Sequence, residues 1–162
     1  MSTKPRGPIA IESVPWTEFS HGARFASRFR VLSDTQGADK RKIGIGYEEL
    51  PPGKQSCPFH YHMQEEEHIV ALEGEATLRL GKERHTIRAG EYVCFPAGQR
   101  AGHCLINETD KPFVYIMIGD HVRDEVCVYP DSGKISVRSL ADDKGRFIVR
   151  AGERVEYWDG EG

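Results

Sequence analysis

The sequence has no excess of basic residues and no long apolar run. Lys and Arg number 22 against 25 Asp and Glu, so the formal net charge is -3 at pH 7. Binding to nucleic acid usually needs a basic excess, so we expect no nucleic-acid partner. No segment approaches the length of a membrane span, and residues 1–15 lack the apolar core of a signal peptide. We therefore expect a cytoplasmic protein with no membrane partner.

Cysteine is sparse and shows no metal-binding or disulfide pattern. The chain has no C-x-x-C pair, and its four cysteines are Cys57, Cys94, Cys104 and Cys127. Spacings this long and uneven are unlike the dense frameworks of small secreted proteins, so we expect reduced thiols. Cys57 and Cys104 stand at odd offsets from His60 and His103. Strand alternation should turn them away from those histidines, to pack as small apolar side chains.

The chain also lacks any long amphipathic pattern of helical period. Short runs rich in β-branched and aromatic residues recur instead between turn signals, and we predict strands there. The runs are Arg28–Leu32, Lys42–Glu48, Pro58–Met63, Glu67–Glu73, Ala76–Leu80, His85–Ile87, Tyr92–Phe95, His103–Ile106, Phe113–Ile118 and Glu125–Tyr129. The links between them are short and carry Gly, Asn or Asp. This rhythm is typical of an antiparallel all-β domain.

A length of 162 residues favours a single domain. So many short strands would leave exposed edges, which a closed barrel or a double-sheet jelly roll removes, with a sandwich as the alternative. We predict one barrel domain over residues 27–148. Residues 1–26 and 149–162 lack a clear period, and we treat them as an N-terminal arm and a C-terminal tail.

Three histidines and one glutamate have the order and spacing of a metal site. His60 and His62 lie in one predicted strand, where side chains two residues apart point to the same face. Glu67 follows across a short bend, and His103 has to return through the tertiary fold. Together they would offer three imidazole nitrogens and one carboxylate to a single divalent ion.

These residues carry a resemblance to the cupin superfamily. Its first motif reads G-x5-H-x-H-x3,4-E-x6-G, which corresponds here to Gly53, His60, His62, Glu67 and Gly74. Its second reads G-x5-P-x-G-x2-H-x3-N, which corresponds to Gly90, Pro96, Gly98, His103 and Asn107. One extra residue precedes His60 and two extra residues precede His103. Both additions fall at loop-like sites, which absorb insertions at little cost.

The resemblance implies a cupin-type double-stranded β-helix, or jelly-roll barrel, that holds one divalent metal ion: Fe, Mn, Ni, Co, Cu or Zn. It implies His60, His62, Glu67 and His103 as the ligands, with the six-residue interval to Gly74 selecting Glu67 over its acidic neighbours. The alternative is a barrel that has lost its metal. The resemblance also implies a homodimer, for which we expect apolar surface around Cys104–Ile106 and around Phe25 and Phe29.

An octahedral ion with four protein ligands keeps two positions for water, dioxygen or substrate oxygens. We expect a small-molecule partner, such as a hydroxy acid, a keto acid or a sugar derivative. Isomerase, lyase or dioxygenase chemistry would each suit such a site, and the sequence assigns no catalytic residue. Because one barrel supports many functions, a non-catalytic small-molecule-binding or sensing protein is the alternative.

Other side chains are weaker candidates. His68 directly follows Glu67 and should point to the outer face, and His21, His85 and His121 have no metal-like spacing. Even offsets from the ligands predict inward positions for Ile69, Ala71 and Leu105. Tyr47, Tyr92 and Tyr115 are candidates for a hydroxyl group in the pocket. Arg30, Arg79 and Arg100 are candidates for a cation that binds a carboxylate or phosphate of the substrate.

The cysteine pattern gives a first test. Denatured protein prepared without reductant, with a chelator present, should titrate with four thiols per chain, because we expect no disulfide. Ellman titration measures this number. A count of two would mean that one pair is oxidised and that the reducing compartment is wrong.

Overall fold

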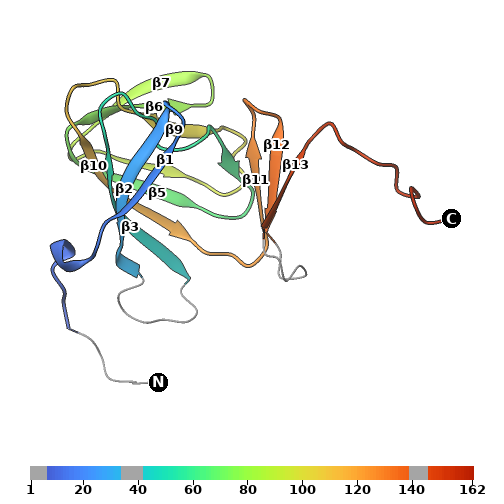
Figure 1. Cartoon of the computed structure of the whole chain (residues 1–162), viewed down its shortest axis with the longest axis horizontal. Coiled ribbons are helices and arrows are strands. Elements are labelled where there is room, and N and C mark those ends of the chain that lie inside the picture. The colour runs from blue at the N-terminus through green and yellow to red at the C-terminus, as the bar shows by residue number, and fades with distance from the viewer. Residues whose placement is uncertain (1–6, 34–41, 139–145) are drawn as a thin grey trace.

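Strands make up nearly all of the regular structure (Figure 1). The computed structural model describes residues 7–33, 42–138 and 146–162. Its elements are η1 (Ile11–Ser13), β1 (Thr17–His21), β2 (Phe25–Val31), β3 (Ile43–Leu50), β4 (Tyr61–His62), β5 (Glu67–Glu73), β6 (Glu75–Leu80), β7 (Glu83–Arg88), β8 (Tyr92–Phe95), β9 (His103–Ile106), β10 (Phe113–Asp120), β11 (Glu125–Tyr129), β12 (Lys134–Arg138) and β13 (Arg146–Arg150). The expected all-β fold is confirmed. Within the described ranges, none of the helical segments could cross a membrane.

The strands form three antiparallel groups. The largest sheet has the order β1-β2-β3-β10-β5-β8, a second has the order β13-β12-β11-β4, and a third has the order β7-β6-β9. An isolated bridge between His60 and His103 joins the segment before β4 to β9. Segments far apart in the chain therefore lie side by side, as a jelly-roll barrel requires.

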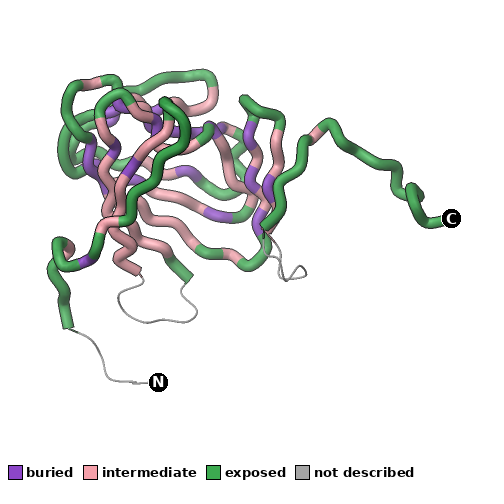
Figure 2. The backbone as a smooth tube through the Cα atoms, viewed as in Figure 1, coloured by how far each residue is buried: buried purple, intermediate pink, exposed green. Residues whose placement is uncertain are grey.

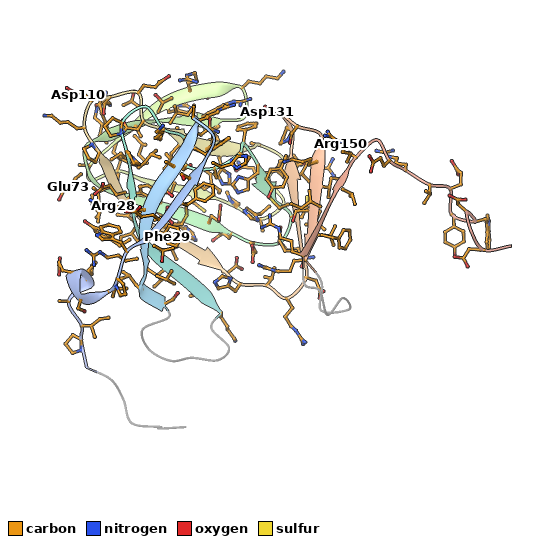
Figure 3. All side chains as sticks on the ribbon, in the orientation of Figure 1. Arg28, Phe29, Glu73, Asp110, Asp131 and Arg150 are labelled. Atoms are coloured by element: carbon orange, nitrogen blue, oxygen red, sulfur yellow. The ribbon has the colours of Figure 1, made fainter. Side chains whose placement is uncertain are left out.

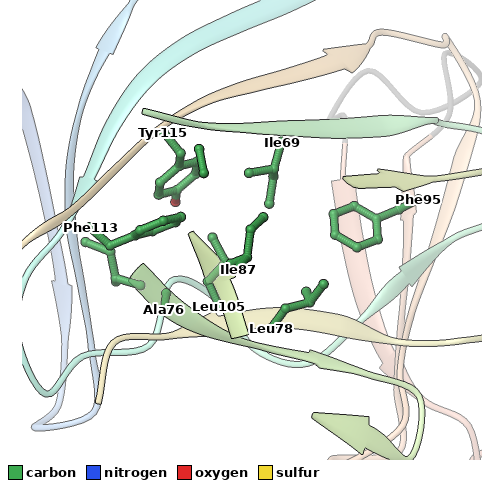
Figure 4. Close-up of a cluster of buried hydrophobic side chains, with 10 residues drawn as sticks. Ile69, Ala76, Leu78, Ile87, Phe95, Leu105, Phe113 and Tyr115 are labelled. Atoms are coloured by element: carbon green, nitrogen blue, oxygen red, sulfur yellow. The ribbon is translucent and has the colours of Figure 1, made fainter. Parts of the chain in front are cut away.

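The core lies between the six-stranded sheet and the β7-β6-β9 group. Side chains from both meet there, and Figure 4 shows Ile69 and Tyr115 facing Leu78 and Leu105 across it. Burial alternates along β5 and β6, with every second side chain directed inward. Strands β9, β10 and β11 also carry buried residues, whereas the C-terminal segment is exposed over nearly its whole length (Figure 2).

The predicted strands match the structure best where apolar residues alternate. The runs Glu67–Glu73, Tyr92–Phe95, His103–Ile106 and Glu125–Tyr129 have the bounds of β5, β8, β9 and β11. Strand β1 was not expected, because all five of its residues are exposed and it carries no apolar period. The expected run Pro58–Met63 shrinks to β4. The boundaries that we drew after residues 26 and 148 fall inside β2 and β13.

The apolar surface expected around Cys104 is not available to a second chain. Cys104 and Leu105 are each 2% exposed and pack inside the single barrel, so this part of the expectation is wrong. The error has a simple cause, since β9 pairs with β6 on one side and its other side is covered by the bridges from Gln55 and His60. A homodimer remains a prediction and would have to use other surfaces.

Asn107 ties together the end of β9, the end of β3 and the loop that leads into β10. Its side chain is fully buried, and its Nδ2 donates to the carbonyls of Leu50 (2.9 Å) and Lys111 (2.7 Å). Its Oδ1 accepts hydrogen bonds from the amide and the hydroxyl of Thr109. Every donor and acceptor of this amide is thus used, as a buried polar group requires.

Asn107→Ala should lower the free energy of unfolding by about 2 kcal/mol, because it leaves the buried Leu50 carbonyl without its donor and removes the part-buried bonds to Lys111 and Thr109. Urea denaturation followed by circular dichroism measures the loss. Asn107→Asp is the matched variant, since it keeps the shape and the acceptor but removes both donors, and it should also destabilise. A value within about 0.5 kcal/mol of the parent for both variants would contradict this role.

Candidate metal centre

The side chains of His60, His62, Glu67 and His103 meet at one point inside the barrel. The Nε2 atoms of His60 and His62 lie 3.1 Å apart. Glu67 Oε2 lies 3.0 Å from Nε2 of His103 and 3.5 Å from Nε2 of His62. The structure therefore brings together all four residues that the sequence nominated, with their ring nitrogens converging on one carboxylate oxygen.

Backbone pairing, more than strand alternation, sets this geometry. His60 lies outside β4, and its bridge to His103 consists of two hydrogen bonds, of 3.3 Å from the His60 amide and 2.7 Å from the His103 amide. His62 is held from the other side, because it is the register partner of Cys127 in β11. Two segments some forty residues apart, those of His60 and His103, are thereby fixed opposite each other.

The outer nitrogens of the three imidazoles differ in their partners, because only that of His60 is held by a hydrogen bond within the described part of the chain. His60 Nδ1 lies 2.8 Å from the carbonyl oxygen of Pro58. A carbonyl only accepts, so Nδ1 carries a proton and donates it to Pro58, and the Nε2 atom faces the centre. His62 Nδ1 lies 3.4 Å from Glu125 Oε1 and 3.6 Å from Glu65 Oε2 but makes no hydrogen bond to a described residue, and His103 Nδ1 is buried without such a partner. Of the three rings, only His60 has the backing by a carbonyl oxygen that is typical of histidines that ligate a metal.

The charges of the cluster suit a divalent cation. Burial lowers the pKa of His103, which favours its neutral ring. Burial alone would raise the pKa of Glu67, but the hydrogen bond from His103 and the neighbouring imidazoles lower it to about 2, so the group is a carboxylate at neutral pH. Three nitrogens and one anionic oxygen form a donor set that fits one divalent transition-metal ion.

His68 points to the opposite face of the sheet, as alternation predicts. Its Nε2 lies 3.0 Å from Glu66 Oε1, and its Nδ1 lies 2.8 Å from the Tyr92 hydroxyl. Strand β5 therefore directs the Glu67 side chain inward and the His68 side chain outward.

A cavity of about 250 Å³ opens beside the four converging residues. Its apolar wall consists of Ile69, Leu78, Phe95, Leu105 and Met117, and its polar wall includes Glu48, Ser56 and Tyr115. The inward positions predicted for Ile69 and Leu105 and the hydroxyl of Tyr115 are thus confirmed. Among the other candidates, Ala71 packs in the core, Tyr47 lies against Trp16 and Tyr92 lies on the outer face.

The positions of Cys57 and Cys104 differ from the expectation that both turn away from the histidines. Its sulfur lies 3.6 Å from His60 Nδ1, and both Cys57 and Cys104 line the cavity, so neither is turned away from the cluster. Alternation fails here because the segment before His60 is irregular and not a strand. Burial raises the pKa of each thiol to about 12, so both are neutral thiols and neither is an activated nucleophile.

Sequence reasoning missed Glu48. This residue in β3 lines the same cavity as Glu67, and its Oε2 accepts a hydrogen bond of 2.7 Å from the Tyr115 hydroxyl. Burial raises the pKa of Glu48, the Tyr115 hydrogen bond opposes this, and the charge of Glu67 adds to it. Only the pairing of β3 with β10 reveals this position, since Glu48 and Tyr115 are 67 residues apart in the chain.

Two of the three candidate arginines, Arg30 and Arg79, are used elsewhere, and Arg100 is exposed and does not line the cavity. Arg30 donates to the backbone carbonyls of Ile11, Glu12 and Val14. Arg79 forms a bidentate pair with Asp131, which lies at the turn between β11 and β12 (Figure 3). Among the described residues, no Lys or Arg lines the cavity.

Comparison with known proteins agrees with this geometry. A protein-family model described as a cupin domain matches residues 46–119. A sugar phosphate isomerase from a cupin superfamily, from Silicibacter pomeroyi, superposes with a TM-score of 0.79 at 23% identity, over 96% of this chain and all of that one. A protein of Acidithiobacillus ferrooxidans, provisionally named a sugar phosphate isomerase, superposes at 0.73 with 29% identity, over 81% of each chain.

A more distant likeness is the polyketide cyclase RemF from Streptomyces resistomycificus, with a TM-score of 0.61 and 21% identity over 72% of this chain and 80% of that one. No curated protein matches the sequence. The matched family model spans the strands that carry all four converging residues, and the whole barrel superposes on solved cupins. Residues 46–119 of this chain therefore match a cupin domain, and the chain has the cupin fold.

Proposed function

We propose that this protein is a metal-dependent enzyme acting on a small oxygenated substrate, and that it is an isomerase. In this proposal His60, His62, Glu67 and His103 hold one divalent ion. When bound, the ion supplies a positive charge that polarises a substrate carbonyl. The residues of the chain then have to orient the substrate, exclude water and move a proton.

The observation that carries the proposal is Glu48. It is a carboxyl group with a raised pKa, in the same cavity as the ligand residues and hydrogen-bonded to Tyr115. A carboxyl whose pKa is shifted toward neutrality can both accept and return a proton. Isomerisation of a hydroxy carbonyl compound needs such a group, because a proton leaves one carbon and returns to its neighbour. Dioxygen activation would not require it.

The apolar wall suits this chemistry. Phe95 stacks on the ring of His103, with centroids 3.8 Å apart and planes inclined by 10°. Ile69 and Leu78 line the same cavity as Phe95 and add to its apolar wall. Excluding water strengthens the electrostatic interactions of the site and protects an enediol intermediate from side reactions.

The likeness to the Acidithiobacillus ferrooxidans protein supports the same class of substrate. At 29% identity over 81% of each chain, it makes a sugar derivative the first compound to test. The cavity has no described Lys or Arg to bind a phosphate, so the substrate would be held chiefly by its hydroxyl and carbonyl oxygens. The rival, a non-catalytic binding protein, is disfavoured by Glu48, because a binding pocket needs no group for proton transfer.

The ligand assignment predicts a specific loss of Mn²⁺ binding, an ion suited to carboxylate more than to thiolate ligands. Replacing His60, His62 or His103 by Ala should weaken binding by more than the roughly 10–100-fold typical of a second-shell change. Glu67→Gln keeps the shape but removes the charge, and it should also weaken binding. Electron paramagnetic resonance of free Mn²⁺ measures the affinity. His85→Ala, which alters an exposed histidine paired with Glu83, is the control. Parent affinity in Glu67→Gln would refute the assignment.

The role of Glu48 predicts a separation of binding from turnover. Glu48→Gln should keep Mn²⁺ binding but slow isomerisation by about 100-fold or more, because it can no longer accept a proton. The assay follows, by NMR in D₂O, deuterium entry at the carbon beside the carbonyl of pentose and hexose phosphates. Glu49→Gln is the matched control, since Glu49 is the next residue of β3 and pairs with Arg28.

Two outcomes would contradict this part of the proposal. If Glu48→Gln exchanged deuterium at the parent rate, Glu48 would not be the proton-transfer group. If the metal-loaded parent exchanged deuterium into none of these sugar phosphates or the corresponding free sugars, the isomerase assignment would fail, and a binding role would gain support.

A further inference from the structure

A second group of metal-ligating side chains lies on the outer face of the barrel. Cys94 in β8 is the direct register partner of His68 in β5. Side chains directly opposite each other in an antiparallel pair share one face of the sheet. Glu66 precedes His68 by two residues and reaches the same face. Imidazole, thiol and carboxylate thus gather on the side away from the cavity.

Their donor atoms are close enough to share an ion. One nitrogen of His68, the sulfur of Cys94 and one carboxylate oxygen of Glu66 all lie within 4.8 Å of one another. His68 Nε2 and Glu66 Oε1 lie 3.0 Å apart. Distances of this size contract to metal–ligand bonds of about 2.0–2.3 Å with small side-chain movements.

Tyr92 orients the histidine. Its hydroxyl lies 2.8 Å from His68 Nδ1, and its ring stacks on the imidazole with centroids 5.9 Å apart. When Nδ1–H donates to the Tyr92 oxygen, Nε2 presents its lone pair toward Glu66 and Cys94. A hydrogen-bond partner behind the ring is the arrangement that fixes the tautomer of ligating histidines.

The group is open to solvent and stands apart from the inner cluster. The side chains of His68 and Glu66 are 26% and 46% exposed, and Cys94 is partly buried. Glu67 and His68 are adjacent in β5 but point to opposite faces, so no ligand is shared. Because β8 is the last strand of its sheet and pairs there with β5, an ion between Cys94 and His68 would clamp that edge.

We propose that Glu66, His68 and Cys94 form a second, zinc-type metal site on the outer face, with Tyr92 positioning His68. Nitrogen, sulfur and oxygen donors together form a set typical of Zn²⁺, and three protein ligands leave a fourth position for water. The Cys94 thiol loses its proton on binding, so the site takes metal as a thiolate complex. The inner assignment of three imidazoles and one carboxylate includes no cysteine, so a thiolate complex of Cys94 would distinguish the outer site from it.

Cobalt is the probe, because Co²⁺ replaces Zn²⁺ and gives a near-ultraviolet thiolate-to-cobalt band only when a cysteine is bound. The metal-free full chain titrated with Co²⁺ should show this band, and added Zn²⁺ should abolish it. Cys94→Ser should lose the band, and His68→Ala should weaken Co²⁺ binding at this site by about 10-fold or more. His103→Ala, which damages the inner cluster, should retain it.

Cys127 supplies the decisive control, because its sulfur lies near His60 and His62 in the inner cluster. Cys127→Ser should leave the band intact. The proposal is overturned if the parent shows no thiolate band, or if Cys127→Ser abolishes the band while Cys94→Ser keeps it. Loss of Mn²⁺ binding at the inner ligands, with this band retained, would uphold the outer site independently of the proposed isomerase.

Discussion

The register of β10 is the constraint on which the cavity depends. This strand lies between β3 and β5 and hydrogen-bonds to both. Tyr115 stands opposite Glu48 on one side, and Gly119 stands opposite Glu67 on the other. Since side chains alternate with a period of two, a slip of one residue in β10 would part Tyr115 from Glu48 and turn its ring out of the core. One strand that contributes no metal ligand therefore sets the spacing between the carboxylate of the ligand cluster and the carboxyl group that we propose moves the proton.

The sequence could predict features that are set by residues only a few positions apart. The short spacings around His60, His62 and Glu67 and the turn at Gly74 are read within a few residues. Gly74 indeed has φ +73°, and a Cβ there would lie 2.7 Å from the Pro112 carbonyl oxygen. What it could not predict was lateral pairing: Glu48 beside Tyr115, or Cys94 beside His68, requires knowing which strands are neighbours. The expected outward direction of Cys57 was wrong because strand alternation was applied to a segment that is irregular in the structure.

Strand β5 contributes side chains to two different groups, one on each face of the barrel wall. Its inward side chains Glu67 and Ile69 belong to the cavity, while His68 between them belongs to the outer group. The two faces differ in their surroundings: the inner group lies beside an apolar cavity, and the outer group is open to solvent. One strand thus presents metal-ligating side chains to two different environments.

The buried amide of Asn107 has a consequence for modification of the chain. The triplet Asn107-Glu108-Thr109 matches the acceptor sequence for N-linked glycans. The side-chain nitrogen of Asn107, which would carry the sugar, is buried and donates hydrogen bonds to the carbonyls of Leu50 and Lys111. A glycan there could be attached only before the barrel closes, and the closed barrel would have no room for it. Folding and glycosylation at this triplet are thus mutually exclusive.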